Sequence, residues 1–190
     1  MDHRDHVQLL RQGIPGSGGV WADLGSGRGA FTLALAELIG EGGQIHSVDK
    51  DRRALQRQER AMRARFPEVD VTYHQDDFTR PLSLPPLDGV VMANALHFIR
   101  HGAAQTAVVR LIHGYLRPGG RLLLVEYGTD QGNRWVPYPL SFRSWQELSG
   151  RCGFQSTSLL ASRPSRFLGE IYSAMSVARS LWQHAKSRYN

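Results

Sequence analysis

Short apolar segments alternate along this chain with longer segments of helical periodicity. The apolar segments have the length and composition of buried strands and lie at residues 20–24, 44–48, 69–74, 87–93, 121–127, 154–160 and 167–175. The helical segments are one that carries Phe31, Leu35 and Leu38 on one face, and those at 52–66, 103–116 and 142–152. This alternation predicts an α/β protein.

The connections between the segments predict how the strands pair. Strands separated by a helix need a crossover and run parallel, whereas the last two segments have no helix between them and can form an antiparallel hairpin. Segment 87–93 is almost wholly apolar, as expected for a central strand covered on both faces. We therefore expect a Rossmann-like, doubly wound, seven-stranded mixed sheet that ends in an antiparallel hairpin.

Size and composition favour one globular domain. A chain of 190 residues is long enough for one well-buried core, and 41% hydrophobic with 21% charged residues is unlike a disordered chain. The longest apolar runs have only strand length, so no membrane span is expected, and the charged start of the chain lacks the apolar core of a secretory signal. We expect a cytoplasmic protein whose single cysteine, Cys152, forms no internal disulfide.

The net charge of +6 raises the question of an anionic partner, because a positive field attracts anions over long distances. The basic residues are spread along the chain and form no tract. Nucleic-acid-binding proteins usually carry clustered basic residues, so a small-molecule partner is favoured over a nucleic acid.

Glycine-rich or polar residues follow the first four strands, at the edge where parallel sheets bind ligands. The first strand runs into Asp23-Leu24-Gly25-Ser26-Gly27-Arg28-Gly29, whose glycines let the backbone approach a ligand closely. Asp49 follows the second strand, where a carboxylate can accept hydrogen bonds from both hydroxyls of a ribose. Asp76-Asp77-Phe78 follows the third strand, and Asn94-Ala95-Leu96-His97 follows the fourth. The pattern indicates a crevice that binds a nucleoside.

Taken together, these segments resemble the class I S-adenosylmethionine (SAM)-dependent methyltransferases, in the branch with a minimal core that acts on small molecules. The matching segments are 23–29, 47–49, 77–78, 87–94 and 116–121, in the family's order and spacing. The resemblance covers roughly residues 20–127, and the final antiparallel hairpin is also a trait of the family. It implies a methyltransferase with SAM as cofactor and S-adenosylhomocysteine as the product.

The resemblance also implies which residues contact the cofactor. These residues are Asp23, Gly25, Ser26, Gly27, Gly29, Asp49, Lys50, Asp77, Phe78 and Asn94. The glycine loop would pack against the methionine part of SAM, with Asp23 near its amino group and the backbone of Asn94 at the same end. Asp49 would hold the ribose, and the segment around Asp77 and Phe78 would meet the adenine, flanked by Lys50.

Within a single domain, 1–190, residues 20–127 would then form the cofactor-binding core and 128–190 the acceptor side. Residues 1–19 would form an arm or lid, in which 7–14 is either a short helix or a loose segment. The loop after the fifth strand would place Trp135 and Tyr138 over the mouth of the pocket, together with Glu126 and Tyr127 from the end of that strand. The alternative for the aromatic residues is packing of the loop against the sheet.

A catalytic base is expected only if the acceptor must lose a proton. His97 lies just past the fourth strand, where the transferred methyl group should emerge, and an imidazole with a pKa of about 6.5 can take up that proton. A packing or capping role is the alternative for His97. Histidines and acids form no evident metal triad in the sequence, so no metal is expected.

Other interpretations of the same residues stay open. Residues 25–30 also fit the dinucleotide fingerprint, which would indicate a nicotinamide-dependent oxidoreductase with a parallel continuation of the sheet. An RNA methyltransferase would use the positive charge, and a non-catalytic SAM-binding protein would need no acceptor site. Locally, Asp49 could cap a helix and Asp77 could be a turn residue.

Overall fold

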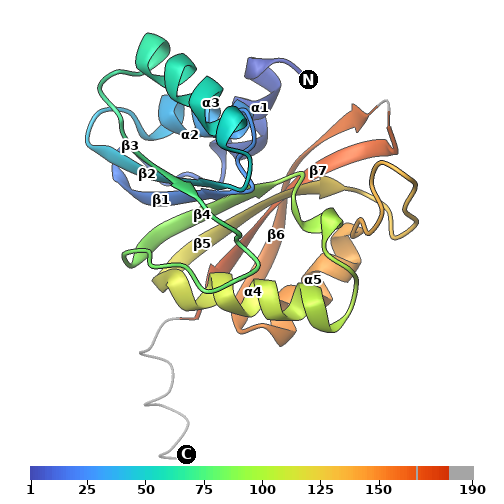
Figure 1. The fold of residues 1–190 in the computed structure, drawn as a ribbon. Coiled ribbons are helices and arrows are strands. Elements are labelled where there is room, and N and C mark those ends of the chain that lie inside the picture. The colour runs from blue at the N-terminus through green and yellow to red at the C-terminus, as the bar shows by residue number, and fades with distance from the viewer. Residues whose placement is uncertain (166, 180–190) are drawn as a thin grey trace, which may run out of the picture.

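The protein is a seven-stranded sheet between two layers of helices, in a computed structural model that describes residues 1–165 and 167–179 (Figure 1). The strands are β1 Gly19–Leu24, β2 Gly43–Asp49, β3 Asp70–Gln75, β4 Leu87–Ala93, β5 Leu116–Tyr127, β6 Phe154–Ser165 and β7 Gly169–Ala178. Their order in the sheet is β3-β2-β1-β4-β5-β7-β6. The first five strands are parallel, and β7 is antiparallel to both β5 and β6. The predicted mixed sheet with its C-terminal hairpin is confirmed.

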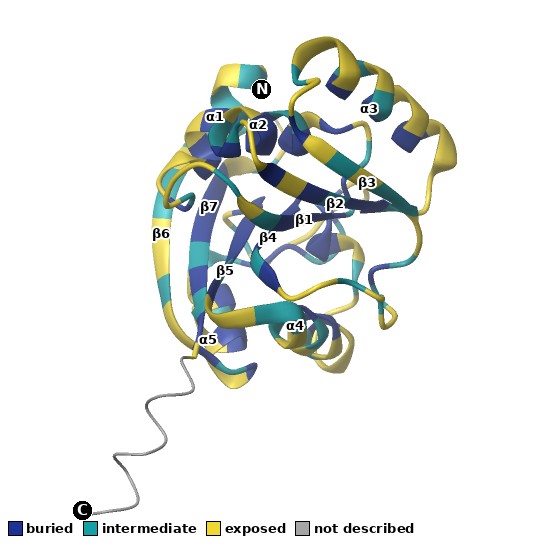
Figure 2. Ribbon diagram, turned by 90° about the vertical axis from the view of Figure 1, so that its left-hand side faces the viewer, coloured by how far each residue is buried: buried dark blue, intermediate teal, exposed yellow. Residues whose placement is uncertain are grey.

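Helices cover both faces of the sheet. The helices are α1 His3–Arg11, α2 Ala30–Ile39, α3 Arg52–Arg65, α4 Ala103–Tyr115 and α5 Phe142–Arg151, with a short 3-10 helix, η1, at Leu96–Phe98. The first three lie on one face and the last two on the other, so that two separate apolar cores form (Figure 1). Figure 2 shows that the strands at the centre of the sheet are buried, while the outer side of α3 is exposed.

The alternation of side chains along β5 assigns its residues to the two cores. Leu122 and Leu124 belong to the core under α4 and α5, whereas Leu123 and Val125 belong to the core under α1 and α2. All four side chains are fully buried. Because successive strand residues point to opposite faces, a continuous apolar run is required here, as the sequence showed.

The N-terminal segment is a packed helix and starts earlier than the expected 7–14. Asp2 caps α1 by accepting a hydrogen bond from the N–H of Asp5, and Leu9 and Leu10 are fully buried, chiefly against α2. The interpretation of this segment as a loose arm is therefore wrong. Burial of two leucines contributes several kcal/mol, which is enough to hold a helix of this length in place.

Two strand boundaries differ from the prediction. Strand β5 begins at Leu116, ahead of the expected residue 121, because Leu116 pairs with Leu87 before an irregular step in the register. Strand β7 begins at Gly169 and runs to Ala178, so Phe167 lies in the turn before it and not in the strand. None of the helices in the described part of the chain has the length and apolar character needed to cross a membrane.

Candidate active site

The segments predicted to bind a cofactor meet at the carboxyl ends of β1, β2, β3 and β4. The chain passes outward from β1 to β2 and β3 and then returns to β4 on the other side of β1, so strand order reverses between β1 and β4 (Figure 1). In open α/β sheets this reversal leaves a crevice between the two strands, where ligands bind. The glycine loop after β1 and the residues after β4 form its two sides.

The glycine loop is held in a conformation that needs glycine. Gly25, Gly27 and Gly29 all have left-handed backbone angles, with φ of 76°, 54° and 85°. A Cβ on Gly25 would lie 2.7 Å from the Cβ of Ala95 and 3.2 Å from the ring of Phe78, whereas a Cβ on Gly27 would meet nothing within 4 Å. The loop is therefore pressed against the core at Gly25 and open at Gly27.

Asp49 at the end of β2 fixes the loop and the start of the following turn. Its Oδ2 accepts a hydrogen bond from the N–H of Gly27 at 2.8 Å, and its Oδ1 accepts one from the N–H of Asp51 at 2.8 Å. The residue that caps helix α3 is Asp51, which accepts bonds from the N–H groups of Arg53 and Ala54. The alternative of Asp49 as a helix cap is thus wrong, and its half-buried carboxylate lies between the glycine loop and the turn that follows β2.

Asp23 is a buried carboxyl group next to the loop. It is 1% exposed, and its Oδ2 accepts a hydrogen bond from the hydroxyl of Thr32 at 2.5 Å. Burial raises the pKa of Asp23 to about 7; the Thr32 bond opposes this rise, and the charge of Asp49 adds to it. A carboxyl group with such a pKa changes its charge near neutral pH, and a cation placed beside it would favour the charged form.

A buried polar network beneath the loop was not foreseen from the sequence. Gln58 of α3 donates to Thr32 at 2.7 Å and to Ser47 at 2.9 Å, and the hydroxyl of Ser47 donates to that of Ser26 at 2.8 Å. Through Thr32, Gln58 is linked to Asp23. One feature of the sequence could have indicated this role. Gln58 lies four residues from both Ala54 and Met62, so it falls on the buried face of α3 among apolar residues.

The segment after β3 lies beside the glycine loop. Asp77 is partly buried and accepts hydrogen bonds from the N–H and the hydroxyl of Thr79 at 3.0 and 2.7 Å, which is a turn-forming role. These bonds hold its pKa below the usual range. The ammonium group of Lys50, which is exposed, lies 3.6 Å from Asp77 Oδ2. Phe78 is buried in the core, with its ring against Gly25.

Asn94 has a strained backbone and an unpaired side-chain oxygen. It is the only non-glycine residue among those described with a positive φ, at 52°. Its N–H donates to the carbonyl of Val125 at 2.9 Å, so the expectation that the backbone of Asn94 faces a ligand does not apply to this N–H. Its buried Oδ1 has no hydrogen-bond partner among the described residues. An unpaired buried acceptor is costly, which is typical of a site where a ligand supplies the donor.

His97 and Glu126 form a buried pair at the ends of β4 and β5. Nδ1 of His97 lies 2.9 and 3.1 Å from the two carboxylate oxygens of Glu126, and the N–H of His97 donates to Oε2 at 3.2 Å. The side chains are 3% and 0% exposed. Because a carboxylate only accepts hydrogen bonds, Nδ1 carries the proton, and Nε2 is left as the basic nitrogen.

The loop after β5 lies next to this pair. The N–H of Tyr138 donates to the carbonyl of His97 at 3.0 Å, and its ring packs edge-on against His101 at 5.5 Å between centroids. Trp135 is largely exposed, and Tyr127 lies edge-on against His97 at 5.6 Å. Tyr138 therefore packs on the segment between β4 and α4, whereas the exposed Trp135 does not pack the loop against the sheet.

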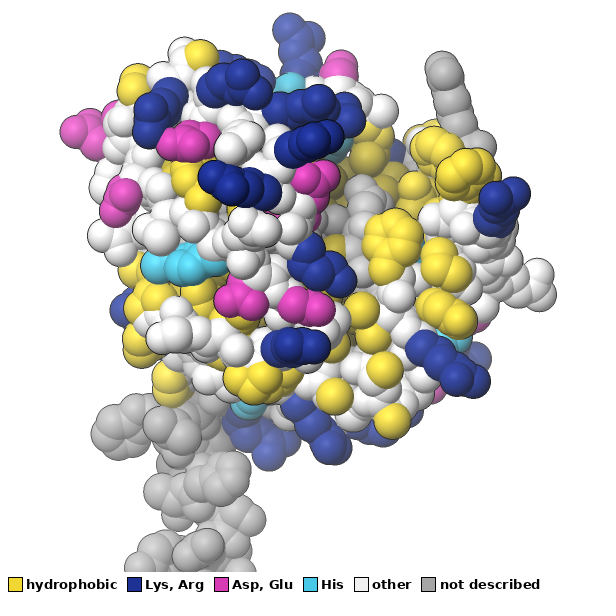
Figure 3. All heavy atoms as spheres, viewed as in Figure 1, with side chains coloured by type: hydrophobic (Ala, Val, Ile, Leu, Met, Phe, Trp, Pro, Cys, Tyr) yellow, Lys and Arg dark blue, Asp and Glu magenta, His cyan; other side chains and the backbone are white. Residues whose placement is uncertain are grey.

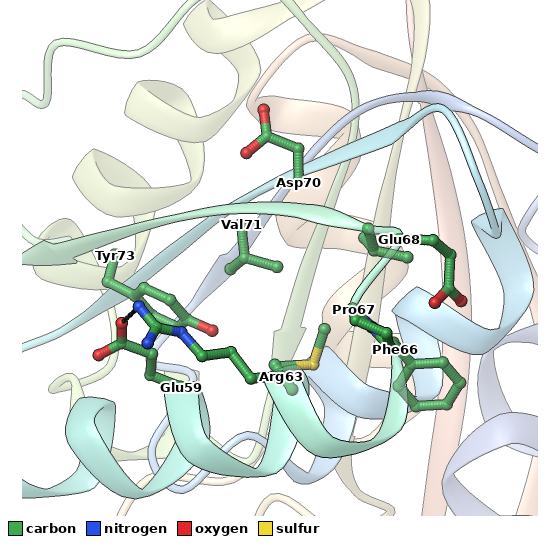
Figure 4. Close-up of a pocket in the computed structure, with 10 residues that line it drawn as sticks. Glu59, Arg63, Phe66, Pro67, Glu68, Asp70, Val71 and Tyr73 are labelled. Carbon is green, nitrogen blue, oxygen red and sulfur yellow. Dashed lines mark hydrogen bonds and ion pairs between the residues drawn. The ribbon is translucent and has the colours of Figure 1, made fainter.

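A cavity of about 410 Å³ between α3 and β3 lies away from this crevice (Figure 4). It is lined by the ion pair between Glu59 and Arg63 and by Tyr73, whose pKa burial and the Glu59 charge raise to about 12. Its other walls come from the turn that leads into β3 and from the first residues of β3. Since the carboxyl ends of the strands, where ligands bind in this type of sheet, do not reach it, we do not assign the chemistry to this cavity.

Comparison with known proteins identifies the family. Residues 22–122 match the family described as "Methyltransferase domain", which is more than half of the 190-residue chain. None of the curated proteins matches the sequence.

Solved structures with this fold share little sequence with the chain. YcgJ of Bacillus subtilis has a TM-score of 0.72 and 13% identity, covering 94% of this chain and 100% of that one. The N-methyltransferase NodS of Bradyrhizobium japonicum WM9, in complex with S-adenosylhomocysteine, has a TM-score of 0.71 and 17% identity, covering 92% and 86%. The N-terminal domain of EvdMO1, in the presence of S-adenosylhomocysteine and D-fucose, has a TM-score of 0.67 and 20% identity, covering 94% and 84%.

The sheet also distinguishes the chain from the nicotinamide-dependent alternative. That alternative predicts a parallel continuation of the sheet, whereas β7 runs antiparallel to β5 and is inserted between β5 and β6. With the sequence match and the fold in agreement, the chain belongs to the class I S-adenosylmethionine-dependent methyltransferases.

Proposed function

We propose that this protein transfers the methyl group of SAM to a hydroxyl group of a small molecule, with His97 as the base. The observation that supports this most directly is the buried bond between His97 and Glu126, because it engages Nδ1 of His97 and leaves Nε2, at the end of β4, as the ring nitrogen that can act as the base. A hydroxyl group is a poor nucleophile until it loses its proton. A positioned base therefore indicates an acceptor that must be deprotonated.

The crevice suits the three parts of SAM. The open backbone at Gly27 and the unpaired Oδ1 of Asn94 would face the methionine part, and Asp23 would pair with its ammonium group. Asp49 would accept hydrogen bonds from the ribose hydroxyls. The segment around Asp77 would meet the adenine, with Phe78 supporting the loop from the core side.

The remaining cofactor residues would act through the shape of the loop. Gly25 and Gly29 let it lie close to the core, since a Cβ on Gly29 would come within 2.4 Å of Gln58, and Ser26 anchors it through the buried polar network. Lys50 would contribute through its contact with Asp77.

When bound, SAM supplies a methyl group on a positively charged sulfur and leaves as S-adenosylhomocysteine. Nε2 of His97 takes the proton of the acceptor hydroxyl, and Glu126 stabilises the imidazolium that results. Most of the remaining rate enhancement comes from alignment of the two reactants, because the reaction needs no covalent intermediate with the protein.

A small molecule is favoured as the acceptor because the basic residues are spread along the chain and do not form the cluster that is typical of nucleic-acid-binding proteins. We infer a division of the single domain in which residues 20–127 hold the cofactor and the segments outside them, including α1, hold the acceptor. Among the structural neighbours, the presence of D-fucose with EvdMO1 is consistent with small acceptors in this fold.

The test is transfer of radioactive methyl from SAM to a panel of phenols, aliphatic alcohols, hydroxy acids, amines and total RNA. The proposal predicts labelled methyl ether products in the small-molecule fraction, and loss of this label in His97→Asn with SAM affinity unchanged. Label in RNA, with binding that weakens steeply as salt is added, would favour the RNA methyltransferase alternative. Binding of SAM without transfer to any acceptor would favour the non-catalytic one.

A further inference from the structure

A second cavity, of about 460 Å³, lies beside the end of β5. Its walls include Met1 and Asp5 at the start of α1, Tyr127 of β5, Arg163 of β6, Phe167 of the following turn and Ile171 of β7. This combination brings the start of the chain together with three adjacent strands of the sheet. Nothing in the cofactor crevice uses these residues, apart from the contact of Tyr127 with His97.

The register of the sheet explains why these side chains face one cavity. Tyr127 pairs with Ile171 across β5 and β7, and Ile171 pairs with Arg163 across β7 and β6. Residues paired across neighbouring strands point to the same face of a sheet. The three side chains therefore form one continuous wall, at the edge of the sheet where the parallel strands end.

One end of this wall, Tyr127, contacts the proposed base, His97. The rings of Tyr127 and His97 are in edge-on contact, with 5.6 Å between their centroids, and Glu126, the partner of His97, precedes Tyr127 in β5. Burial raises the pKa of Tyr127, and the Glu126 charge adds to this, so the phenol stays neutral. An acceptor lying in the cavity could therefore present its hydroxyl group past Tyr127 to His97.

Arg163 places a cationic group in the cavity, where its ion pair with Asp5 is a long one. Its Nε is buried without a hydrogen-bond partner among the described residues. Its ionic partner among the described residues is Asp5, whose Oδ1 lies 3.8 Å from Nε, beyond hydrogen-bonding distance; the other oxygen, Oδ2, accepts the N–H of Asp2. A guanidinium with free donors matches the geometry of a carboxylate or another oxyanion.

Apolar side chains surround the same edge. Five large hydrophobic residues are exposed among those described, and two of them, Met1 and Phe167, line the cavity. Two others follow the carboxyl ends of strands: Phe98 lies in η1 after β4, and Trp135 lies in the loop after β5. Figure 3 shows hydrophobic side chains gathered around a hollow on the side where the loop after β5 and the β6–β7 turn lie. Exposed apolar groups that cluster in this way usually mark a binding site.

We infer that this cavity binds the methyl acceptor and that it selects an apolar, ring-bearing molecule with one anionic group. The ring would lie among the apolar walls, the anionic group would pair with Arg163, and the hydroxyl group would reach His97. The inference rests on the proposed function for the hydroxyl, but the preference for an aromatic anion rests on the cavity alone.

The preference can be tested with two fluorescent probes that share one apolar body. Anilinonaphthalene sulfonate carries an anionic group, and N-phenyl-1-naphthylamine is its uncharged counterpart. We expect the sulfonate to bind the protein more tightly than the amine. Arg163→Gln should weaken sulfonate binding about tenfold, as for loss of a charge-assisted hydrogen bond, and leave the amine unchanged.

Two further variants separate charge from shape. Arg163→Lys keeps the charge and should retain sulfonate affinity within about threefold, and Arg143→Gln removes an exposed arginine of α5, paired with Glu147 outside the cavity, and should have no effect. Near-ultraviolet circular dichroism checks that every variant is folded. Equal affinity for the two probes, or an Arg163→Gln variant that binds the sulfonate as the native protein does, would overturn the inference.

The outcome is independent of the cofactor proposal. Calorimetric titration with SAM on the same samples reports on the crevice. If the protein binds SAM but binds the charged and uncharged probes equally, this inference alone is refuted. If sulfonate binding depends on Arg163 but SAM does not bind, the proposed function alone is refuted. Where transfer is observed, the sulfonate should inhibit competitively against the acceptor, and inhibition competitive only against SAM would contradict the assignment of the cavity.

Discussion

Nδ1 of His97 lies 2.9 Å from Oε1 of Glu126, and this bond joins the ends of β4 and β5 in the interior of the protein. The two residues are 29 positions apart and meet because β4 and β5 pair in parallel, with Ala93 opposite Val125. The carboxylate fixes which nitrogen of the imidazole carries the proton. The same bond orients the ring, so removal of either partner should affect catalysis more than cofactor binding.

The first prediction concerns this pair. His97→Asn keeps a donor near the position of Nδ1 and removes the base, so kcat for a hydroxyl acceptor should fall by about 100-fold or more. Glu126→Gln keeps the shape but no longer stabilises the imidazolium, and kcat should fall by about 10-fold to 100-fold. Initial rates with radioactive SAM measure both, and calorimetry should show SAM affinity within about twofold of the native value. Equal loss of SAM affinity in both variants would mean that the pair is only structural.

The second prediction concerns the pH dependence of cofactor binding. If Asp23, with a pKa of about 7, pairs with the ammonium group of SAM, its charged form is the one that binds. Affinity for SAM should then increase as pH rises from about 5.5 to 7.5, by up to about tenfold per pH unit below the pKa. Calorimetry at several pH values measures this, and Asp23→Asn should bind weakly with no such dependence. A flat profile for the native protein would show that Asp23 does not face the ammonium group.

The third prediction gives the effect of the same group on stability. The folded-state pKa of Asp23 is raised above its unfolded value of 3.8, so its contribution to stability is fully present below that value and is lost as pH rises through about 7. Asp23→Asn removes the cost of the buried charge while retaining an oxygen for Thr32. The variant without ligand should therefore melt above the native protein at pH 8, and the difference should shrink toward pH 5. A difference that is constant with pH in differential scanning calorimetry would argue against the raised pKa.

The fourth prediction separates the roles of two loop glycines. Gly25→Ala forces a left-handed alanine against Ala95 and Phe78, so the melting temperature should fall by about 5 °C or more. Gly27→Ala meets no neighbour and bears only the backbone cost of about 1 kcal/mol, or about 2 to 4 °C. Because Gly27 is where the loop is open, its variant should nevertheless lose SAM affinity by about tenfold or more. Thermal melts and SAM titrations of the pair check this, and a Gly27→Ala variant with native affinity would contradict the placement of the ligand.

Local patterns were sufficient to predict the sheet and the glycine loop. Parallel strands of this kind are apolar on both faces, so segments such as 87–93 and 121–127 stand out, and glycine is favoured where φ is positive, as at Gly25. Asp49, the acid after β2, could also be placed, because its distance from the glycine loop follows from the length of one strand–helix–strand unit.

Contacts between distant segments could not be predicted from these patterns. The bond from Glu126 to His97 depends on the register of β4 and β5, and the role of Gln58 depends on how α3 lies over the loop. Arg163 looked like any other surface arginine, because the cavity exists only once β7 is inserted between β5 and β6. For the N-terminal segment, the sequence could not decide between a helix and a loose segment, since the buried leucines of α1 contact α2 and strands from the end of the chain.

Calorimetric titration of SAM into the native protein, Asp49→Asn and Asp51→Asn tests the central claim most directly. Asp51 is the matched control, because asparagine caps a helix about as well as aspartate and the residue lies outside the proposed contacts. The account predicts that native protein and Asp51→Asn bind SAM equally, that Asp49→Asn binds about 10-fold to 100-fold more weakly, and that none of the three binds NADH. Native protein that binds NADH and not SAM, or an Asp49→Asn variant with native affinity for SAM, would contradict it.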